Sequence, residues 1–282
     1  MVHIPDAQDF GSTVQSGAAT SDGDWSRPAG RAKRMPKDEL RGRVLDAAEA
    51  LLRESGLTVS VYHLNMEELI RRVGVPRSSA FSAFGGKENL ITELILRLVH
   101  PEDSLGAAFS PGTIQVAQQV IAENAHRMVN ADGTPNRAGR DAVLREAIRV
   151  GAKQNYDDIS SSAAWRTFMA LSVSLDGLPP ERRERVTETM QIVEARFIDT
   201  MSEFYEGLLS VFGRRVRDGL TLRHIATAGT AVVESVAERR FLGAQILSEP
   251  VMWPGLDGEP VEWHMASIGF LAVIENMTEP ID

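Results

Sequence analysis

The sequence predicts an all-α fold, in which a small N-terminal unit of three helices in a helix-turn-helix arrangement precedes a larger helical domain. Three observations lead to this prediction. From residue 39 onward, apolar residues recur every three or four positions. No segment shows a convincing strand pattern. The chain contains no cysteine, which excludes disulfide frameworks and thiolate metal sites.

Composition and charge divide the 282 residues into three parts. Residues 1–36 are rich in Gly, Ser, Asp and Ala and have no apolar period, so we predict a disordered tail that ends in a basic arm. Residues 37–100 form the predicted helix-turn-helix domain, and residues 101–282 the larger domain. The net charge of −9 argues against nucleic-acid binding over the whole surface. However, residues 26–100 carry 13 Lys and Arg against 9 Asp and Glu, so a polyanion could meet this segment alone.

The sequence predicts neither export nor insertion into a membrane. The segment Met1–Ser26 has four Asp, no Lys or Arg and no apolar stretch, unlike a secretory signal. No apolar run approaches the roughly 20 residues that a membrane-spanning helix needs. We therefore expect a cytoplasmic protein with no membrane partner.

The N-terminal helices are predicted from their apolar faces and their ends. The first helix begins at Glu39 and is stopped by Gly56. A second, short helix opens at Asn65, three residues before Glu68, close to a capping box. Their apolar positions are Leu40, Val44, Ala47, Ala48, Leu51 and Leu52 in the first helix and Met66, Leu69, Ile70 and Val73 in the second.

A tight turn at Gly74-Val75 leads into a third helix. Pro76 can start this helix because a first-turn position needs no N–H group. The helix runs to about Ala83, and Gly85-Gly86 then breaks the chain before a fourth helix over residues 87–99. Ala80, Phe81 and Phe84 are expected to face the neighbouring helices.

Two short helices joined by a glycine turn, the second of them polar, have the geometry of a helix-turn-helix. The second helix of such a motif enters the major groove, so it needs small and polar residues that allow close approach to base edges. Arg77, near the helix start, could reach a guanine or a phosphate. The alternative is a helical hairpin without a role in DNA binding. The groove-facing candidates are Ser78, Ser79, Ala80, Ser82 and Ala83.

The remainder of the chain is also predicted to be helical. A Pro- and Gly-rich loop is expected at residues 250–260, and the longest helix, at residues 181–212, carries a stripe of apolar residues spaced by three or four. The other helices are expected at residues 113–129, 138–153, 161–175, 221–242 and 261–277.

Residues 39–99 resemble the N-terminal domain of TetR-family transcriptional regulators. The resemblance rests on residues 65–90, where the turn Gly74-Val75, the aromatic pair Phe81 and Phe84, and Lys87-Glu88 followed by Leu90 match the family pattern. Upstream, Ala47-Ala48 and Gly56 match as well. The resemblance implies a homodimer that reads two half-sites of a palindromic double-stranded DNA operator, with Lys87 in contact with phosphate. The predicted DNA-binding residues are Arg31, Lys33, Arg34, Asn65, Met66, Arg77, Ser78, Ser79, Ser82 and Lys87.

The sequence departs from the family pattern at several positions. Phe81 and Ala83 replace a Tyr and a following His or Tyr whose side chains contact phosphate, and neither can donate a hydrogen bond. Pro76 replaces a hydroxyl N-cap, Ser78-Ser79 replaces Gly-Thr, and Gly85-Gly86 replaces a Pro-Ser pair. A helical interaction protein that kept the fold and lost sequence-specific DNA binding therefore remains the alternative.

The basic arm offers a compensation for these departures. Arg31, Lys33 and Arg34 precede the first helix, and a flexible arm of this kind can follow phosphates or enter the minor groove. The alternative interpretation is a solvated tail.

The last two helices are predicted to form the dimer interface. The helices at residues 221–242 and 261–277 carry faces of small residues, and two such helices from each subunit could build a four-helix interface with twofold symmetry. The alternative is ordinary packing within one chain. The residues of these faces are Ile225, Ala228, Gly229, Ala231, Val232, Ser235 and Val236, and Met265, Ile268, Gly269, Leu271, Ala272 and Ile274.

The larger domain is also expected to bind a small apolar or amphipathic effector whose binding releases DNA, which would make the protein a repressor. Aromatic and Met side chains with a few polar tips could line an apolar pocket, although such stripes also form ordinary cores. The candidates are His126, Trp165, Phe168, Met169, Phe197, Met201, Phe204 and Tyr205.

No pattern in the sequence predicts an enzyme. The six His residues show no metal-ligand spacing, and a Gly-x-Ser-x-Gly nucleophile motif is absent. The segment Gly85-Gly86-Lys87-Glu88 lacks the residues of a phosphate-binding loop. We expect neither a metal nor a cofactor.

Overall fold

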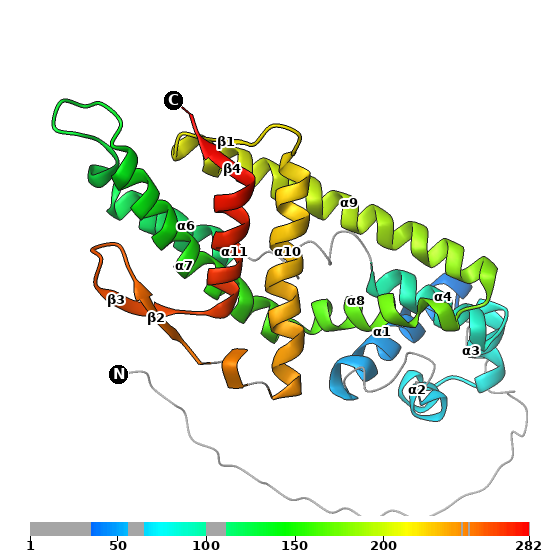
Figure 1. Cartoon of the computed structure of the whole chain (residues 1–282). Helices are drawn as coiled ribbons and strands as arrows, with labels where there is room; N and C mark the ends of the chain where they lie inside the picture. Colours follow the sequence, from blue (N-terminus) through cyan, green and yellow to red (C-terminus); the bar gives the residue numbers. More distant parts are fainter. Residues whose placement is uncertain (1–34, 56–64, 100–110, 244, 248, 282) are drawn as a thin grey trace, which may run out of the picture. The chain divides into compact units, whose positions relative to one another are not determined.

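The computed structural model describes residues 35–55, 65–99, 111–243, 245–247 and 249–281 and shows a mainly helical chain (Figure 1). The predicted all-α fold class is confirmed. Residues 37–282 form one compact unit. The predicted basic arm with Arg31, Lys33 and Arg34 and the predicted stop at Gly56 lie outside the described residues.

Four helices build the helix-turn-helix part of this unit. They are α1 (Lys37–Ser55), α2 (Met66–Val73), α3 (Arg77–Phe84) and α4 (Lys87–Leu98). Helix α1 contacts each of the other three, and α3 also contacts α4. The apolar positions predicted from the period meet in this core, where Val44, Leu69 and Leu90 are almost fully buried.

The larger part is a bundle built around the long helix α9 (Pro180–Val211). Helices α6 and α7 pack against each other, and α10 packs against α7, α9 and α11. Among the described helices, none combines the length and the apolar content that a membrane crossing requires. The other helical elements are α6 (Pro111–Glu123), η2 (Ala125–Met128), α7 (Arg137–Ser161), α8 (Ala163–Ser174), η3 (Leu175–Gly177), α10 (Leu222–Arg239), η4 (Arg240–Leu242), η5 (Gln245–Leu247) and α11 (Met265–Met277).

The expectation of a chain without strands is wrong. Strand β1 (Arg214–Val216) pairs antiparallel with β4 (Thr278–Pro280), and β2 (Val251–Pro254) pairs antiparallel with β3 (Pro260–Trp263). Because β1 precedes α10 and β4 follows α11, the β1–β4 pair holds these two helices in antiparallel order, as Figure 1 shows. Strands of three or four residues are too short for an alternating pattern to be recognised.

The second strand pair also corrects two predicted boundaries. The expected loop at residues 250–260 is largely a β-hairpin, and the expected start of the last helix, near residue 261, belongs to β3. Trp253 and Trp263 meet edge to face with ring centroids 5.3 Å apart, and the Arg145 guanidinium lies 5.4 Å from the Trp253 ring centroid. Helix α11 then begins after His264, whose Nδ1 accepts a hydrogen bond from the N–H of Ala266 at 3.2 Å.

Candidate functional site

The turn between α2 and α3 is built by residues that suit its backbone. Asn65 caps α2, because its side-chain oxygen accepts hydrogen bonds from the N–H groups of Glu67 and Glu68, each at 3.1 Å. Gly74 ends α2 in the left-handed region, with a φ of 71°, and its N–H donates to the carbonyl of Ile70. A side chain with a Cβ rarely adopts this φ, so glycine fixes the turn that separates the two helices.

Helix α3 presents a polar face to solvent. Arg77, Ser78, Ser79 and Ser82 are exposed, as predicted for residues that approach base edges. Ala80 and Ala83 are buried together with Phe84, so both are wrong as groove-facing candidates, whereas the expectation that Ala80 and Phe84 face the neighbouring helices is confirmed. Positions 80, 83 and 84 share one side of a helix, and α1 and α4 cover that side.

Two further predicted DNA-binding positions have other roles in the fold. Met66 was predicted to contact DNA, but it is buried in the core of the helix-turn-helix part, so its side chain has no access to a nucleic acid. Asn65 is exposed, although its oxygen is occupied by the cap of α2. Phe81 was expected to face its neighbours. It is half-buried, and the Arg77 guanidinium lies 5.4 Å from its ring centroid.

Ion pairs decide which basic residues of this surface remain available. Arg71 and Arg72 both bind Glu68, at 2.6 Å and 2.9 Å, and these hydrogen bonds hold the pKa of the Glu68 carboxyl below its usual value. Arg77 and Lys87 are exposed and form no ion pair with a described residue. The free positive charge therefore lies at the start of α3 and at the start of α4.

Two arginines of α1 hold the ends of the motif helices. Arg41 Nη1 donates to the carbonyl of Ala83 at 3.0 Å, and the same guanidinium lies 4.9 Å from the Phe84 ring centroid and pairs with Glu93. Arg43 Nη2 donates to the carbonyl of Val73 at 3.2 Å. Carbonyls at helix ends lack partners within the helix, so these contacts fix where α2 and α3 end. Sequence reasoning counted both arginines only as charge and missed this positioning role.

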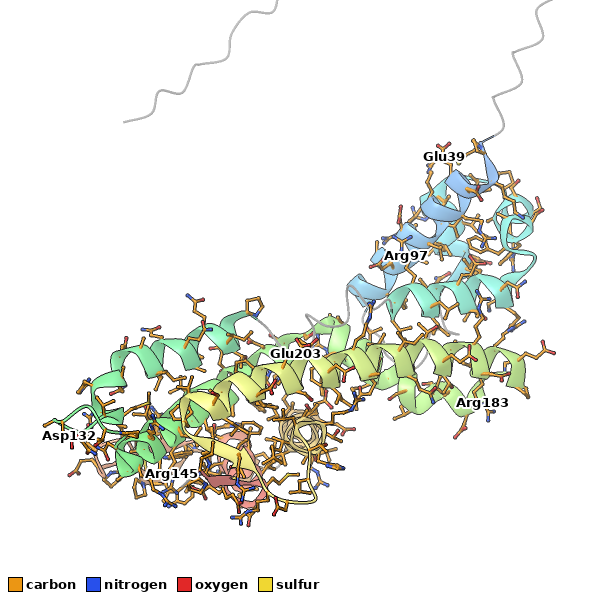
Figure 2. All side chains as sticks on the ribbon, turned by 90° about the horizontal axis from the view of Figure 1, so that it is seen from above. Glu39, Arg97, Asp132, Arg145, Arg183 and Glu203 are labelled. Carbon is orange, nitrogen blue, oxygen red and sulfur yellow. The ribbon has the colours of Figure 1, made fainter. Side chains whose placement is uncertain are left out.

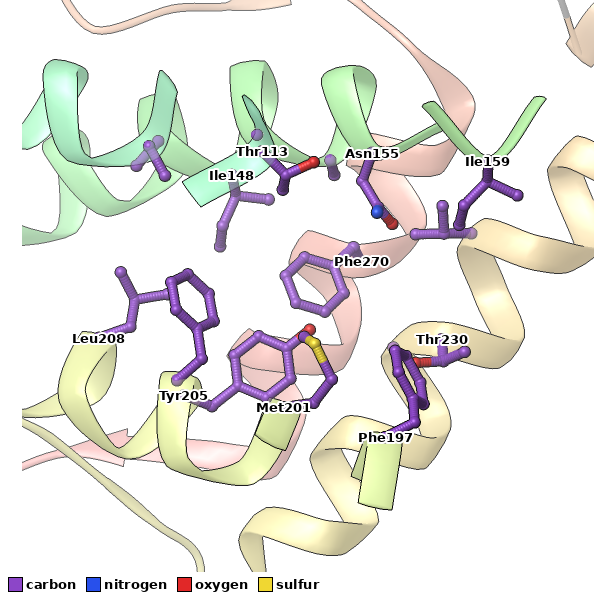
Figure 3. A pocket seen from close by; sticks show the side chains of 17 residues that line it. Thr113, Ile148, Asn155, Ile159, Phe197, Met201, Tyr205, Leu208, Thr230 and Phe270 are labelled. Carbon is purple, nitrogen blue, oxygen red and sulfur yellow. The ribbon is translucent and has the colours of Figure 1, made fainter. Parts of the chain in front are cut away.

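The larger domain contains a mostly apolar cavity between α6, α7, α9, α10 and α11 (Figure 3). About 610 Å³ there is free of protein atoms, a volume that includes space open to solvent. In Figure 3, Thr113, Ile148 and Asn155 face Phe197, Met201 and Tyr205 of α9 across this space. The lining residues are Thr113, Ala117, Ala147, Ile148, Gly151, Ala152, Asn155, Ile159, Phe197, Met201, Phe204, Tyr205, Leu208, Gly229, Thr230, Val233 and Phe270.

Four of the eight predicted effector residues lie on the cavity wall, namely Phe197, Met201, Phe204 and Tyr205. The other four lie elsewhere. His126 is exposed in η2, and Phe168 and Met169 are half-buried in α8 outside the lining. Trp165 is buried and donates its Nε1–H to Glu234 Oε1 at 2.8 Å.

Sequence reasoning missed the lining residues that come from other helices, such as Ile148, Asn155 and Phe270. A helical period identifies a buried face, but it does not tell which buried faces surround a space. Gly151 and Gly229 also line the cavity, but helical glycines such as Gly207 have no neighbour within 4 Å of a built Cβ, so a glycine in a helix was not a sufficient signal.

No protein-family model and no curated protein matches the chain. Solved structures do match. A transcriptional regulator of the TetR family from Vibrio parahaemolyticus has 20% sequence identity and a TM-score of 0.43, and the match covers 85% of this chain and 98% of that chain. The chain is similar to TetR-family transcriptional regulators.

Two further structures extend the comparison. A TetR-family transcriptional regulator from Rhodococcus sp. has 12% identity and a TM-score of 0.37, with coverage of 85% of this chain and 98% of that chain. NalD from Pseudomonas aeruginosa, described as the secondary repressor of the MexAB-OprM multidrug efflux pump, has 18% identity and a TM-score of 0.31, with coverage of 86% and 94%.

Small residues of α10 and α11 serve packing between the two helices. A Cβ added at Gly229 would lie 2.4 Å from Cε2 of Phe270, and one added at Gly269 would lie 2.6 Å from Cγ1 of Val232. Both glycines thus allow close contact within one chain. Ala231 and Ala272 are exposed, so a face of small residues remains on the outside of the pair.

Helix α9 contacts the helix-turn-helix part and also forms a wall of the cavity. Near its start it contacts α4, where Arg182 Nη1 pairs with Glu88 at 2.7 Å. Figure 2 shows α9 running from this end, near Arg183, to Glu203. The cavity residues Met201 and Tyr205 flank Glu203 in the sequence. Within the described ranges, no group of three or more His, Asp or Glu side chains is placed to hold a metal ion.

Proposed function

We propose that this chain is a DNA-binding transcriptional regulator that inserts α3 into the major groove. The observation that carries the proposal is the exposed face of Arg77, Ser78, Ser79 and Ser82 on a helix fixed by a glycine turn. Serine side chains are short, so the backbone of α3 can approach base edges, and Arg77 can reach a guanine or a phosphate.

The free charges support this role for the surface. Arg77 and Lys87 have no acidic partner among the described residues, so binding a phosphate costs neither of them an existing ion pair. Lys87 is the first residue of α4, where the helix N–H groups also favour an anion. The arm with Arg31, Lys33 and Arg34 would add further phosphate contacts.

The proposed regulator acts as a homodimer on a palindromic operator. The exposed small residues Ala231 and Ala272 would let α10 and α11 of two subunits approach closely in a four-helix interface. A twofold dimer presents two copies of α3, which matches a DNA site with inverted half-sites.

A small effector in the cavity would release the DNA, so that the regulator acts as a repressor. An effector can do this only if it binds more tightly to an arrangement of the two α3 helices that fits DNA poorly. Helix α9 could transmit such a change, because it contacts α4 and lines the cavity.

The test measures binding to a duplex of arbitrary sequence by fluorescence anisotropy at several salt concentrations. Lys87→Ala should weaken binding and reduce the slope of log affinity against log salt by about 1, the effect of one lost phosphate contact. Arg77→Ala should weaken binding as well. Arg137→Ala is the matched control, since Arg137 is exposed on α7 and forms no ion pair with a described residue.

The result that contradicts the proposal is binding that is absent, or that both variants leave unchanged, while the fold is intact by circular dichroism. That result would favour a helical interaction protein that kept this fold without sequence-specific DNA binding.

A further inference from the structure

Tyr205 presents an unusual polar group to the cavity. The residue is 5% exposed, yet its hydroxyl forms no hydrogen bond with any described residue. Its ring is held between aromatic neighbours, with the Phe204 centroid 5.5 Å away and the Phe270 centroid 5.6 Å away. Because Tyr205 lines the cavity and its hydroxyl has no described partner, that hydroxyl is available to a molecule bound there.

The protonation state of the Tyr205 hydroxyl determines whether it can donate a hydrogen bond to a ligand. Burial raises the pKa of the Tyr205 hydroxyl above its usual value, so the group is a neutral phenol at any physiological pH. A phenol can donate its hydrogen to an oxygen acceptor such as a carbonyl. Thr230 offers a second hydroxyl on the wall that forms no hydrogen bond with a described residue.

The cavity wall also indicates the charge of the occupant. None of the 17 lining residues is Asp, Glu, Lys, Arg or His. A charged group in this space would lose its hydration without gaining an opposite charge, which costs far more than one hydrogen bond returns. The rings of Phe197, Phe204 and Phe270 instead offer contact surface for a flat apolar molecule.

We infer that the cavity binds an uncharged aromatic compound whose oxygen acceptor receives a hydrogen bond from the Tyr205 hydroxyl. The inference deepens the effector site of the proposed function and rests on it. Tyr205 would distinguish ligands by that hydrogen bond, while the surrounding rings would supply most of the binding through apolar contact.

The test uses isothermal titration calorimetry on the full chain without DNA, so its outcome is independent of DNA binding. The probes are three compounds of similar shape, namely 2-acetylnaphthalene with a carbonyl acceptor, naphthalene with none, and 2-naphthoate with a negative charge. The variants are Tyr205→Phe and, as a matched control, Tyr156→Phe, since Tyr156 stacks on His264 and does not line the cavity.

We expect wild-type protein to bind 2-acetylnaphthalene, and to bind 2-naphthoate at least tenfold more weakly. Tyr205→Phe should weaken binding of 2-acetylnaphthalene by about five- to tenfold, the typical effect of one hydrogen bond, and leave naphthalene binding unchanged. Tyr156→Phe should change neither affinity. If Tyr205→Phe fails to fold, the comparison of the three probes on wild-type protein and on Thr230→Val still tests the charge preference of the cavity.

Three results would overturn the inference. The first is no binding of 2-acetylnaphthalene up to its solubility limit. The second is 2-naphthoate binding as tightly as 2-acetylnaphthalene. The third is equal loss of naphthalene and 2-acetylnaphthalene affinity in Tyr205→Phe, which would indicate a change of cavity shape instead of a lost hydrogen bond.

Discussion

Glu234 of α10 is a carboxyl group whose charge works against the fold. Its pKa is raised to about 7, mainly by burial and also by the nearby charges of Glu194 and Glu238, against the lowering effect of the hydrogen bond from Trp165. The folded chain therefore holds a proton at Glu234 between about pH 4.5 and 7, where the unfolded chain has already lost it. The folded state binds more protons in this range, so the stability that Glu234 contributes falls as the pH rises from 4.5 to 7.

Glu234→Gln should remove this pH dependence and keep the hydrogen bond, because the amide oxygen still accepts from Trp165. Relative to wild type, the variant should gain stability as the pH rises from 5 to 8, by roughly 1–3 kcal/mol at pH 8. Urea unfolding at pH 5, 6, 7 and 8 measures the difference. Glu203→Gln, the same substitution at an exposed position on α9, is the matched control. Parallel pH profiles for Glu234→Gln and wild type would contradict the assignment.

For single residues, the sequence predicted some of the exposed and buried positions correctly and others wrongly. Arg77 and Lys87 are exposed and unpaired with described residues as a DNA-binding role requires, whereas Met66 and Ala83 are buried. Met66 is the first residue of α2 and is buried, so it belongs to the core. The cavity that Tyr205 lines is built with residues of four other helices, which the local sequence around Tyr205 does not reveal.

Among the elements, α10 and α11 depend on a close approach at one glycine. Gly229 faces the ring of Phe270, and a Cβ there would overlap the ring at 2.4 Å. Phe270 also lines the cavity, so a displacement of its ring would change the shape of the proposed ligand site.

Gly229→Ala should therefore destabilise the fold by about 1–3 kcal/mol, the usual cost of overpacking a core. Gly207→Ala provides the matched control, because nothing lies within 4 Å of a Cβ built at Gly207 on α9. That control should be neutral or stabilise by about 0.4–1 kcal/mol, since alanine restricts the unfolded chain more than glycine does. Urea unfolding of both variants tests the difference, and equal stability would show that α10 and α11 do not pack as closely as described.

Helices with a long apolar pattern could be predicted from the sequence, whereas short strands could not. The stripe of α9, from Val186 through Met190, Val193, Phe197 and Met201, is buried as its period indicated. The β2–β3 hairpin could not be predicted, because its strands are four residues long and depend on contacts such as that between Trp253 and Trp263. Pairings between distant segments depend on the whole fold.

In the whole molecule, the proposed regulation needs two regions, the exposed face of α3 and the cavity in the larger domain. One region presents an exposed polar helix with free positive charge, and the other encloses a cavity without charged walls. Helix α9 contacts α4 and also lines the cavity, so an effector has a continuous structural element through which to act. As a regulator of the proposed kind, the chain would have to recognise sequence through the α3 surface, because a regulator must distinguish its operator from other DNA.

Selection of bound duplexes from a randomised DNA pool at about physiological salt tests this claim most directly. At such salt concentrations non-specific binding is already weak, so enrichment reports sequence recognition. We expect an enriched inverted repeat whose half-site spacing reflects a twofold dimer. Arg77→Ala should relax the base preference at one position of each half-site. A folded dimer that enriches no sequence would contradict the proposed function.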